Sequence, residues 1–293
     1  MRQVAFKQVD VFTRIPFLGN PLAVILDATG ISEHEMQRIA RWTNLSETSF
    51  VLPPTCAAAD YRLRIFTTTQ ELPFAGHPSI GTAHALLEAG LLQPVANRWT
   101  QECGAGLLRL YRSGATPADR RIHVQVPRAK IAPAAAALDR QIEAVFGLKP
   151  RQVDQARVVD VGAIWLVVDL DSATSVRALQ PSSAALEQLS ASLGVTGITV
   201  FGRQSGGDAK LAVRSFCPGE GMFEDPVCGS GNASVAAYLH ARGTLHAIGP
   251  TYRASQGREL GRDGYVDVAV DASGDIEIGG ACVTCVDGFI RLK

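Results

Sequence analysis

The sequence predicts an α+β protein with two pseudo-symmetric halves, each a strongly curved, mostly antiparallel sheet wrapped around a central helix. One observation is a repeated motif, because residues 71–76 and residues 224–229 both read Glu-x-Pro-x-x-Gly. Each copy follows a strand-like run that begins with Arg and contains Phe, and each precedes an alanine-rich helical pattern. The other observation is that strand patterns outnumber helical ones, with one long helix per half beside the glycine motif.

In the first half, apolar runs predict strands and one capping box predicts a helix. Ser32 and Glu35 have the capping-box spacing, so the helix starts there and continues to about Trp42. Before and after the first motif, strands are expected at residues 4–13, 22–26, 48–52 and 61–66, and two more around residues 104–106.

Residues 113–118 are the expected hinge between the halves because Gly, Ser, Thr and Pro gather there. The predicted domains are therefore residues 1–117 and 118–293, with packing of the last strand on the N-terminal half left open. In the second half we expect helices at residues 134–146 and 182–193. The second motif with its flanks occupies residues 213–240, and strands are expected at residues 121–126, within 153–170, at 197–202 and from 251 to 292.

The composition excludes several classes of function. The chain has 28 basic and 28 acidic residues and no basic stripe, which argues against a nucleic-acid platform or a polybasic membrane anchor. No apolar run approaches the ~20 residues of a membrane helix. The first eight residues alternate polar and apolar and lack the apolar segment of a secretory signal, so we expect a cytoplasmic protein.

The six cysteines are scattered and are expected to be reduced thiols. Cys282 and Cys285 form a CxxC within a strand-like run. Residues three apart in a strand point to opposite faces, so we favour a structural role over a shared metal. No second CxxC or histidine pair completes a zinc site, and no metal is predicted.

Both motifs place a glycine where a helix begins, and a helix N-terminus favours an anion through its unpaired N–H groups and its dipole. The repetition predicts two halves that face each other across one anion-binding cleft. The two copies differ chemically: Asp225 stands where the first copy has Leu72, while His77 follows the first glycine.

Three residues are candidates for acid–base chemistry. Glu47 lies between a helix end and a strand start, where catalytic groups are often presented, although a solvated carboxylate would also fit that position. His77 and Asp225 lie in the two motif loops, where a surface histidine and an Asx turn are the structural alternatives.

Cys228 and Ser230 complete the second loop. A thiolate at a helix N-terminus would have a lowered pKa and could act as a base. Ala75 occupies the equivalent position in the first copy, so only one thiol is available and a two-base racemase is disfavoured. We place a packed, bystander Cys228 slightly ahead of a catalytic one. The Gly-Ser-Gly spacing fits neither a P-loop nor a nucleophile elbow.

Four motifs in this order resemble the PhzF-like phenazine-biosynthesis family. They are residues 10–24, residues 44–48, residues 64–78 and residues 224–230. The resemblance runs from the first strand to the glycine turns at residues 279–280 and 287–288. It implies the diaminopimelate-epimerase-like fold, a homodimer and cofactor-independent acid–base chemistry.

The resemblance also implies roles for individual residues. The family's catalytic glutamate matches Glu47, and its supporting histidine, aspartate and serine match His77, Asp225 and Ser230. Gly76 and Gly229 match glycines whose N–H groups bind the substrate carboxylate, and the motif around Glu47 adds Ser46 as a substrate-binding candidate. One departure is Cys228, which is often a threonine in the phenazine enzymes; Cys-Gly-Ser-Gly is instead similar to a loop of diaminopimelate epimerase and proline racemase relatives.

We therefore predict an isomerase that moves a proton on a small carboxylate-bearing substrate, similar to trans-2,3-dihydro-3-hydroxyanthranilate isomerase. No cofactor, nucleic acid or membrane partner is predicted. The alternatives are a one-thiol epimerase or dehydratase that uses Cys228, and a non-catalytic small-molecule binding protein.

Overall fold

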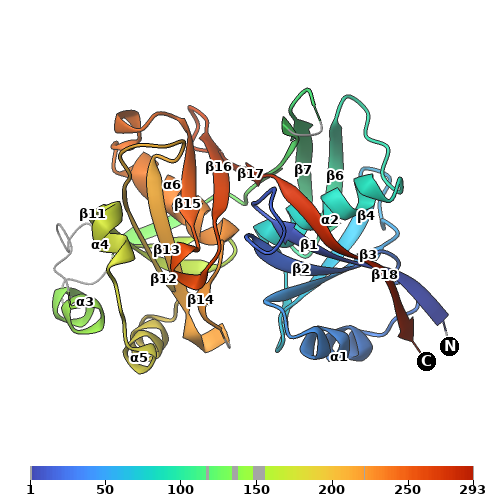
Figure 1. Ribbon diagram of the computed structural model, residues 1–293, viewed down its shortest axis with the longest axis horizontal. Helices are drawn as coiled ribbons and strands as arrows, with labels where there is room; N and C mark the ends of the chain where they lie inside the picture. The colour runs from blue at the N-terminus through green and yellow to red at the C-terminus, as the bar shows by residue number, and fades with distance from the viewer. Residues whose placement is uncertain (1, 117–118, 134–137, 148–155, 221, 293) are drawn as a thin grey trace. The chain divides into compact units, whose positions relative to one another are not determined.

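A computed structural model describes residues 2–116, 119–133, 138–147, 156–220 and 222–292 (Figure 1). Contacts divide the chain into two compact units. Unit 1 comprises Met1–Gln125 with Gly279–Lys293, and unit 2 comprises Val126–Ile278. The chain changes unit after residue 125, whereas the boundary predicted from the sequence falls at residues 117 and 118, which lie outside the described residues.

Unit 1 has a mixed sheet in which antiparallel pairs predominate. Its helices are α1 (Glu33–Thr43) and α2 (Gly76–Glu88), and its strands are β1 (Arg2–Val11), β2 (Asn20–Ile25), β3 (Glu47–Leu52), β4 (Tyr61–Phe66), β5 (Glu71–Leu72), β6 (Arg98–Cys103), β7 (Gly106–Ser113), β8 (Arg121–Gln125) and β18 (Cys282–Leu292). The pairs β18–β1, β1–β2, β3–β4, β4–β5, β6–β7 and β7–β8 are antiparallel. The pairs β2–β3 and β4–β6 are parallel.

Unit 2 also has a mixed sheet. Its helices are α3 (Leu138–Phe146), α4 (Ala173–Arg177), α5 (Ser183–Leu193) and α6 (Gly229–Ala241), with 3-10 turns η3 (Pro218–Glu220), η4 (Leu245–Ala247) and η5 (Arg258–Leu260). Its strands are β9 (Lys130–Pro133), β10 (Arg157–Asp160), β11 (Ile164–Ser172), β12 (Gly197–Arg203), β13 (Leu211–Cys217), β14 (Met222–Asp225), β15 (Thr251–Gln256) and β16 (Gly264–Val270), and β17 (Ile276–Gly280) returns the chain to unit 1. The pairs β11–β12 and β13–β15 are parallel, and β9–β10, β10–β11, β12–β13, β13–β14 and β15–β16 are antiparallel.

Local signals in the sequence located several helices. Helix α1 begins with the predicted capping box, in which the Ser32 side chain accepts from the Glu35 N–H and the Glu35 carboxylate accepts from the Ser32 N–H. Ser182 caps α5, in agreement with the helix start predicted at residue 182. The described part of the helix predicted at residues 134–146 forms α3, and residues 134–137 lie outside the described part.

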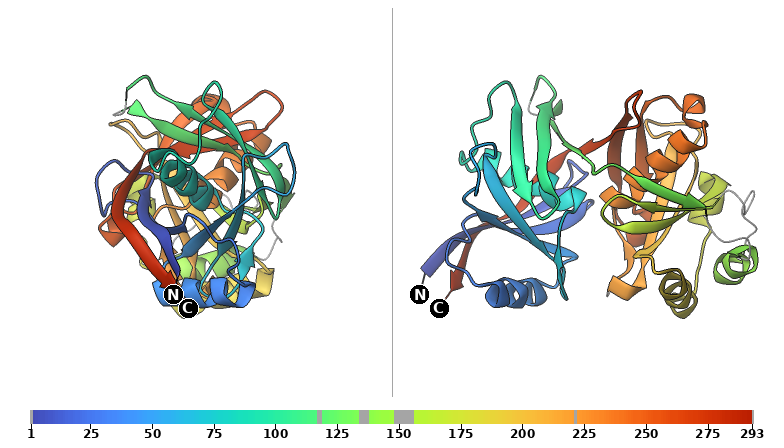
Figure 2. Two further views of the ribbon diagram at one scale, coloured as in Figure 1. Left: turned by 90° about the vertical axis from the view of Figure 1, so that its right-hand side faces the viewer. Right: turned by 180° about the vertical axis from the view of Figure 1, so that it is seen from behind.

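The last strand belongs to unit 1 because β18 pairs with β1 from Arg2↔Leu292 to Val11↔Cys282. Figure 2 shows the two chain ends side by side at the end of this pair. The register shifts between Gln8, which faces Val286, and Val9, which faces Thr284, so Cys285 is the extra residue of a β-bulge. The bulge interrupts the strict alternation on which our interpretation of the CxxC depended.

Helices α2 and α6 are buried along most of their length. Helix α2 contacts β1, β2, β3, β8 and β18, and small residues let the strands approach it closely. A Cβ at Gly81 would lie 2.7 Å from Val11 Cγ2 and 2.7 Å from Leu22 Cδ2, both on buried side chains. Because Gly81 has no side chain, α2 can pack directly against the sheet at this position.

The Arg and Phe shared by the two repeated segments form the same contact in each unit. Arg214 binds both carboxylate oxygens of Glu224, at 2.9 and 2.8 Å, and its guanidinium lies 4.8 Å from the Phe216 ring centre. In unit 1, Arg64 binds Glu71 through the same two nitrogens and lies 5.1 Å from the Phe66 ring centre. Each guanidinium thus joins neighbouring strands immediately before the Pro and Gly of the motif.

The two ion pairs differ in burial. The side chains of Arg214 and Glu224 are 5% and 1% exposed, whereas those of Arg64 and Glu71 are 17% and 36% exposed. Removing one partner of a buried pair leaves an uncompensated charge without water around it, while a partly exposed pair is screened.

We expect Glu224→Gln to lower the free energy of unfolding by about 3–5 kcal/mol, because it leaves the Arg214 guanidinium buried without its counterion. The matched variant Glu71→Gln should cost about 1 kcal/mol or less. Urea unfolding followed by circular dichroism measures both. Equal losses in the two variants would contradict the argument from burial.

Candidate functional site

Glu47 and His77 lie together in unit 1. Glu47 is the first residue of β3, reached through Asn44, whose left-handed φ of 55° ends α1. His77 is the second residue of α2. The Nε2 atom of His77 lies 3.4 Å from Oε2 of Glu47, and neither atom has a hydrogen-bond partner within the described part of the chain. The two groups therefore face each other with hydrogen-bonding capacity left over.

Asn20, the first residue of β2, contacts the His77 ring on the side away from Glu47 and orients it. It is fully buried, and its amide nitrogen lies 3.4 Å from His77 Nδ1. In this amide orientation Nδ1 accepts, so the neutral imidazole carries its proton on Nε2 and directs it toward Glu47. The Ser46 hydroxyl donates to Asn20 Oδ1 at 3.4 Å. Ser46, Asn20, His77 and Glu47 thus form one chain of contacts.

The imidazole of His77 is neutral at neutral pH. Burial lowers the pKa of His77 below its ordinary value, and the nearby Glu47 carboxylate, which acts in the opposite direction, does not outweigh this. A neutral imidazole with its proton on Nε2 can donate a hydrogen bond to a carboxylate or to a substrate oxygen.

Asp225 lies at the end of β14 in unit 2 and is 7% exposed. Its Oδ1 accepts the N–H of Val227 at 3.0 Å, which is the Asx-type contact named above as the structural alternative. Gln256 fixes the same loop, because its amide donates to the Asp225 carbonyl at 2.9 Å and accepts from the Cys228 N–H at 3.1 Å. The carboxylate thus sits on a loop held from both sides.

Ser230 and Cys228 surround the start of α6. The Trp165 indole N–H donates to Ser230 Oγ at 3.0 Å, and the same oxygen lies 3.5 Å from Cys228 Sγ, a contact in which either group can be the donor. Cys228 is the N-cap of α6, and its sulfur accepts the Gly231 N–H at 3.2 Å. Burial, with a further contribution from Asp225, raises the pKa of Cys228 well above its ordinary value, so the thiol is protonated at neutral pH.

The two motif glycines are the first helical residues, Gly76 of α2 and Gly229 of α6. The caps differ, because Ala75 has no side chain that could cap α2 while Cys228 caps α6. A helix without a side-chain cap leaves its first N–H groups for water or an anion.

The structure thus brings the predicted residues together within each unit. Unit 1 holds Ser46, Glu47, Gly76 and His77, and unit 2 holds Asp225, Cys228, Gly229 and Ser230. Asn20, Trp165 and Gln256 were not predicted as site residues. Asn20 belongs to the motif at residues 10–24, in which we assigned no site residue, and no local signal marks Trp165 or Gln256.

Among the described residues, no group of three or more His, Cys, Asp or Glu side chains could hold a metal ion. The same residues contain no helix with the length and apolarity needed to cross a membrane.

Comparisons with known proteins give consistent results. Residues 9–288 match the family model for phenazine biosynthesis-like proteins. The chain is 40% identical to antisense-enhancing sequence 1 of Schizosaccharomyces pombe, over 98% of this chain and 99% of that protein. It is 32% identical to the trans-2,3-dihydro-3-hydroxyanthranilate isomerase of Pseudomonas chlororaphis, over 97% and 98% of the two chains.

Solved structures share the fold. A PhzF-family phenazine biosynthesis protein from Bacillus anthracis matches with a TM-score of 0.84 and 25% identity over 100% of both chains. A probable proline racemase from Agrobacterium radiobacter matches with a TM-score of 0.67 at 16% identity, over 99% of this chain and 93% of that one. These folds have a mixed sheet and few helices, which agrees with the α+β class predicted from the sequence.

By class the protein is an isomerase, like the several relatives that bear this name. It belongs to the phenazine biosynthesis-like, or PhzF, family, which confirms the resemblance inferred from its motifs.

The lowered pKa of His77 predicts a pH dependence of stability. Unfolded His77 takes up a proton near its ordinary pKa of about 6.5, whereas the folded residue does so only at lower pH. The contribution of neutral His77 to the free energy of unfolding is therefore complete above pH ~6.5, and it is lost as the pH falls toward the pKa of the folded residue. We expect the free energy of unfolding to fall between pH ~7 and ~5, and to fall less steeply in His77→Gln.

The measurement is urea unfolding at several pH values, with His34→Gln as the control because His34 is exposed. His84 is half-buried, and burial lowers its pKa as well, so His77→Gln removes part of the slope and not all of it. An unchanged slope in His77→Gln would contradict the assignment.

Proposed function

We propose that the protein is a cofactor-independent isomerase that transfers a proton within a small carboxylate-bearing substrate. The observation that carries the proposal is the buried Glu47–His77 contact at 3.4 Å, in which both facing atoms lack a hydrogen-bond partner among the described residues. A carboxylate that takes a proton and returns it needs neither metal nor organic cofactor.

In the proposed reaction, the Glu47 carboxylate withdraws a proton from a carbon next to an unsaturated system. The electron pair of the broken C–H bond enters the conjugated system, and the protonated Glu47 returns the proton to a carbon further along. His77, with its proton on Nε2, holds Glu47 in place before the transfer and stabilises the carboxylate when the proton leaves.

The substrate carboxylate is assigned to the helix N-termini. The N–H groups of Gly76 and Gly229 and the hydroxyl of Ser230 are the proposed donors, and Ser46 is a further substrate contact. The hydrogen bond from Trp165 to Ser230 supports this role, because it holds the serine hydroxyl in place at the start of α6. Asp225 is assigned to orient a polar or cationic group of the substrate.

The family suggests one substrate to test first. The Pseudomonas chlororaphis relative is a trans-2,3-dihydro-3-hydroxyanthranilate isomerase. That compound carries the carboxylate and the conjugated system that the proposed chemistry requires.

The proposal extends to organisation and location. The order of strand pairs in unit 1 from β1 to β7 recurs in unit 2 from β10 to β16, which supports two pseudo-symmetric halves, each around one helix. We further propose a homodimer in the cytoplasm, in keeping with the family resemblance.

Glu47→Gln should lower turnover by at least ~100-fold, because a glutamine cannot accept the proton. The assay follows trans-2,3-dihydro-3-hydroxyanthranilate by proton NMR in D₂O. Glu187→Gln, an exposed change on α5, is the matched control and should behave as wild type. A Glu47→Gln variant with near-normal turnover would remove Glu47 from the mechanism.

If the wild-type protein leaves this compound unchanged, the compound is not its substrate. Proton transfer would then be tested on other unsaturated carboxylates. Deuterium incorporation into such compounds, lost in Glu47→Gln, would then identify the substrate class.

Cys228→Ser should reduce turnover by far less than ~100-fold, because the buried thiol is protonated and serine preserves an acceptor for the Gly231 N–H. The same NMR assay measures the effect. A loss comparable to that of Glu47→Gln would favour an epimerase or dehydratase in which Cys228 is the base.

A further inference from the structure

Unit 1 contains a cavity of about 530 Å³ away from the Glu47–His77 contact. Three arginines line it, Arg14, Arg112 and Arg120. Apolar wall is supplied by Leu87, Ile122 and Val283. This volume falls within the range of small-molecule sites, which are mostly apolar with a few polar groups that fix the orientation of the ligand.

The acidic groups near the cavity do not neutralise the three arginines. Among the described residues that line it, Glu88 is the one acid, and it already binds Lys7 at 2.8 Å and Thr284 at 2.6 Å. The side chain of Lys7 is 5% exposed and binds Asp287 as well, at 2.7 Å. Glu88 is therefore part of a separate ion cluster around the buried Lys7 ammonium, and its charge is compensated there.

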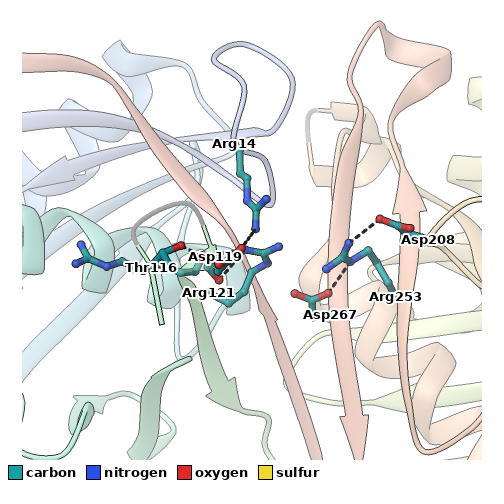
Figure 3. Close-up of polar contacts among 8 residues, drawn as sticks. Arg14, Thr116, Asp119, Arg121, Asp208, Arg253 and Asp267 are labelled. Carbon is teal, nitrogen blue, oxygen red and sulfur yellow. Dashed lines mark hydrogen bonds and ion pairs between the residues drawn. The ribbon is translucent and has the colours of Figure 1, made fainter. Parts of the chain in front are cut away.

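Asp119 partly compensates the charge of one of the three arginines, Arg14. Its Oδ1 lies 3.9 Å from Arg14, and its Oδ2 accepts the Thr116 hydroxyl at 2.8 Å (Figure 3). Arg121 holds the backbone here by donating to the carbonyls of Asp119 and Arg120 at 2.9 and 3.0 Å. Arg112 donates to the Asn97 amide oxygen at 2.6 Å, a neutral partner. The wall therefore keeps an excess of positive charge.

We propose that this cavity, the arginine pocket, binds a small organic anion with a carboxylate or phosphate group on an apolar body. The guanidinium groups would bind the anionic group, since their planar donors match carboxylate and phosphate oxygens, and the apolar wall would cover the body. This site is additional to the proposed reaction and does not depend on it.

The arginine pocket is distinct from the candidate catalytic residues. Ser46, Glu47 and His77 are not among its lining residues, whereas His84 is. His84 lies seven residues after His77 on the same helix, which corresponds to ~10 Å along the axis. The pocket also flanks both places where the chain passes between units, because Arg120 and Ile122 precede the first passage and Gly280 follows the second.

The test is isothermal titration of the full chain with phenyl phosphate and with benzoate at low salt, with benzyl alcohol as the uncharged comparison. We expect saturable binding of at least one anion, weakening with salt, and no binding of benzyl alcohol. Arg120→Gln should weaken anion binding by about tenfold or more, as the loss of a charge-assisted contact does.

Arg120 is exposed and makes no ion pair within the described part of the chain, so its replacement leaves the fold intact. Arg14→Gln gives a second, independent variant. Arg203→Gln, an exposed arginine of unit 2, is the matched control for the change in total charge and should bind as wild type.

A double variant, His77→Asn with Ser230→Ala, separates this pocket from the candidate catalytic residues. Anion binding that persists there and weakens in the Arg120 and Arg14 variants supports the arginine pocket. The proposal fails if neither anion binds at millimolar concentration, if the arginine variants bind as wild type, or if binding is lost only in the double variant.

Discussion

The ion pair between Arg214 and Glu224 is the constraint on which the geometry of unit 2 depends. It is almost fully buried, it is bidentate, and the Phe216 ring covers its guanidinium. The same guanidinium donates to the carbonyls of Val176 and Leu179, so α4 is tied to it as well. Glu224 directly precedes Asp225, and the N-terminus of α6 follows. Because the buried Arg214 must remain paired with Glu224, this ion pair fixes where the loop from Asp225 to α6 begins.

Unit 1 uses the same device in a more exposed form, through Arg64 and Glu71. Close packing then fixes the helix that follows. Gly81 in α2 admits no Cβ against β1 and β2, and a Cβ at Gly231 in α6 would lie 2.4 Å from the Ser215 hydroxyl. A hairpin end held by an ion pair and a helix held by close packing leave little freedom for the first helical turn. This is the arrangement that an anion-binding N-terminus needs, because preorganised N–H groups lose little entropy on binding.

The sequence predicted features that depend on local patterns. The Ser32 capping box, the start of α5 at Ser182 and the motif glycines at helix starts all involve residues a few positions apart. The supporting contacts could not be predicted in this way. Asn20 reaches His77 across 57 residues, Gln256 reaches Cys228 across 28, and Trp165 reaches Ser230 across 65. The strand register that brings them together is a property of the whole sheet. The repeated Arg and Phe were visible in the sequence, but their pairing with Glu required the hairpin.

The facing atoms of Glu47 and His77 are among the buried polar atoms of the described residues whose hydrogen-bonding capacity is unused. Each is buried, and each lacks a hydrogen-bond partner among the described residues, although such groups normally have one because an unpaired polar atom away from water is costly. Asn20 prevents the imidazole from rotating its proton away, and burial prevents it from taking a second one. The His77 imidazole therefore stays neutral, and Oε2 of Glu47 keeps its capacity to accept a hydrogen bond. A ligand that bonds either atom would recover free energy that folding left unused, and this is the physical argument behind the role proposed for these two residues.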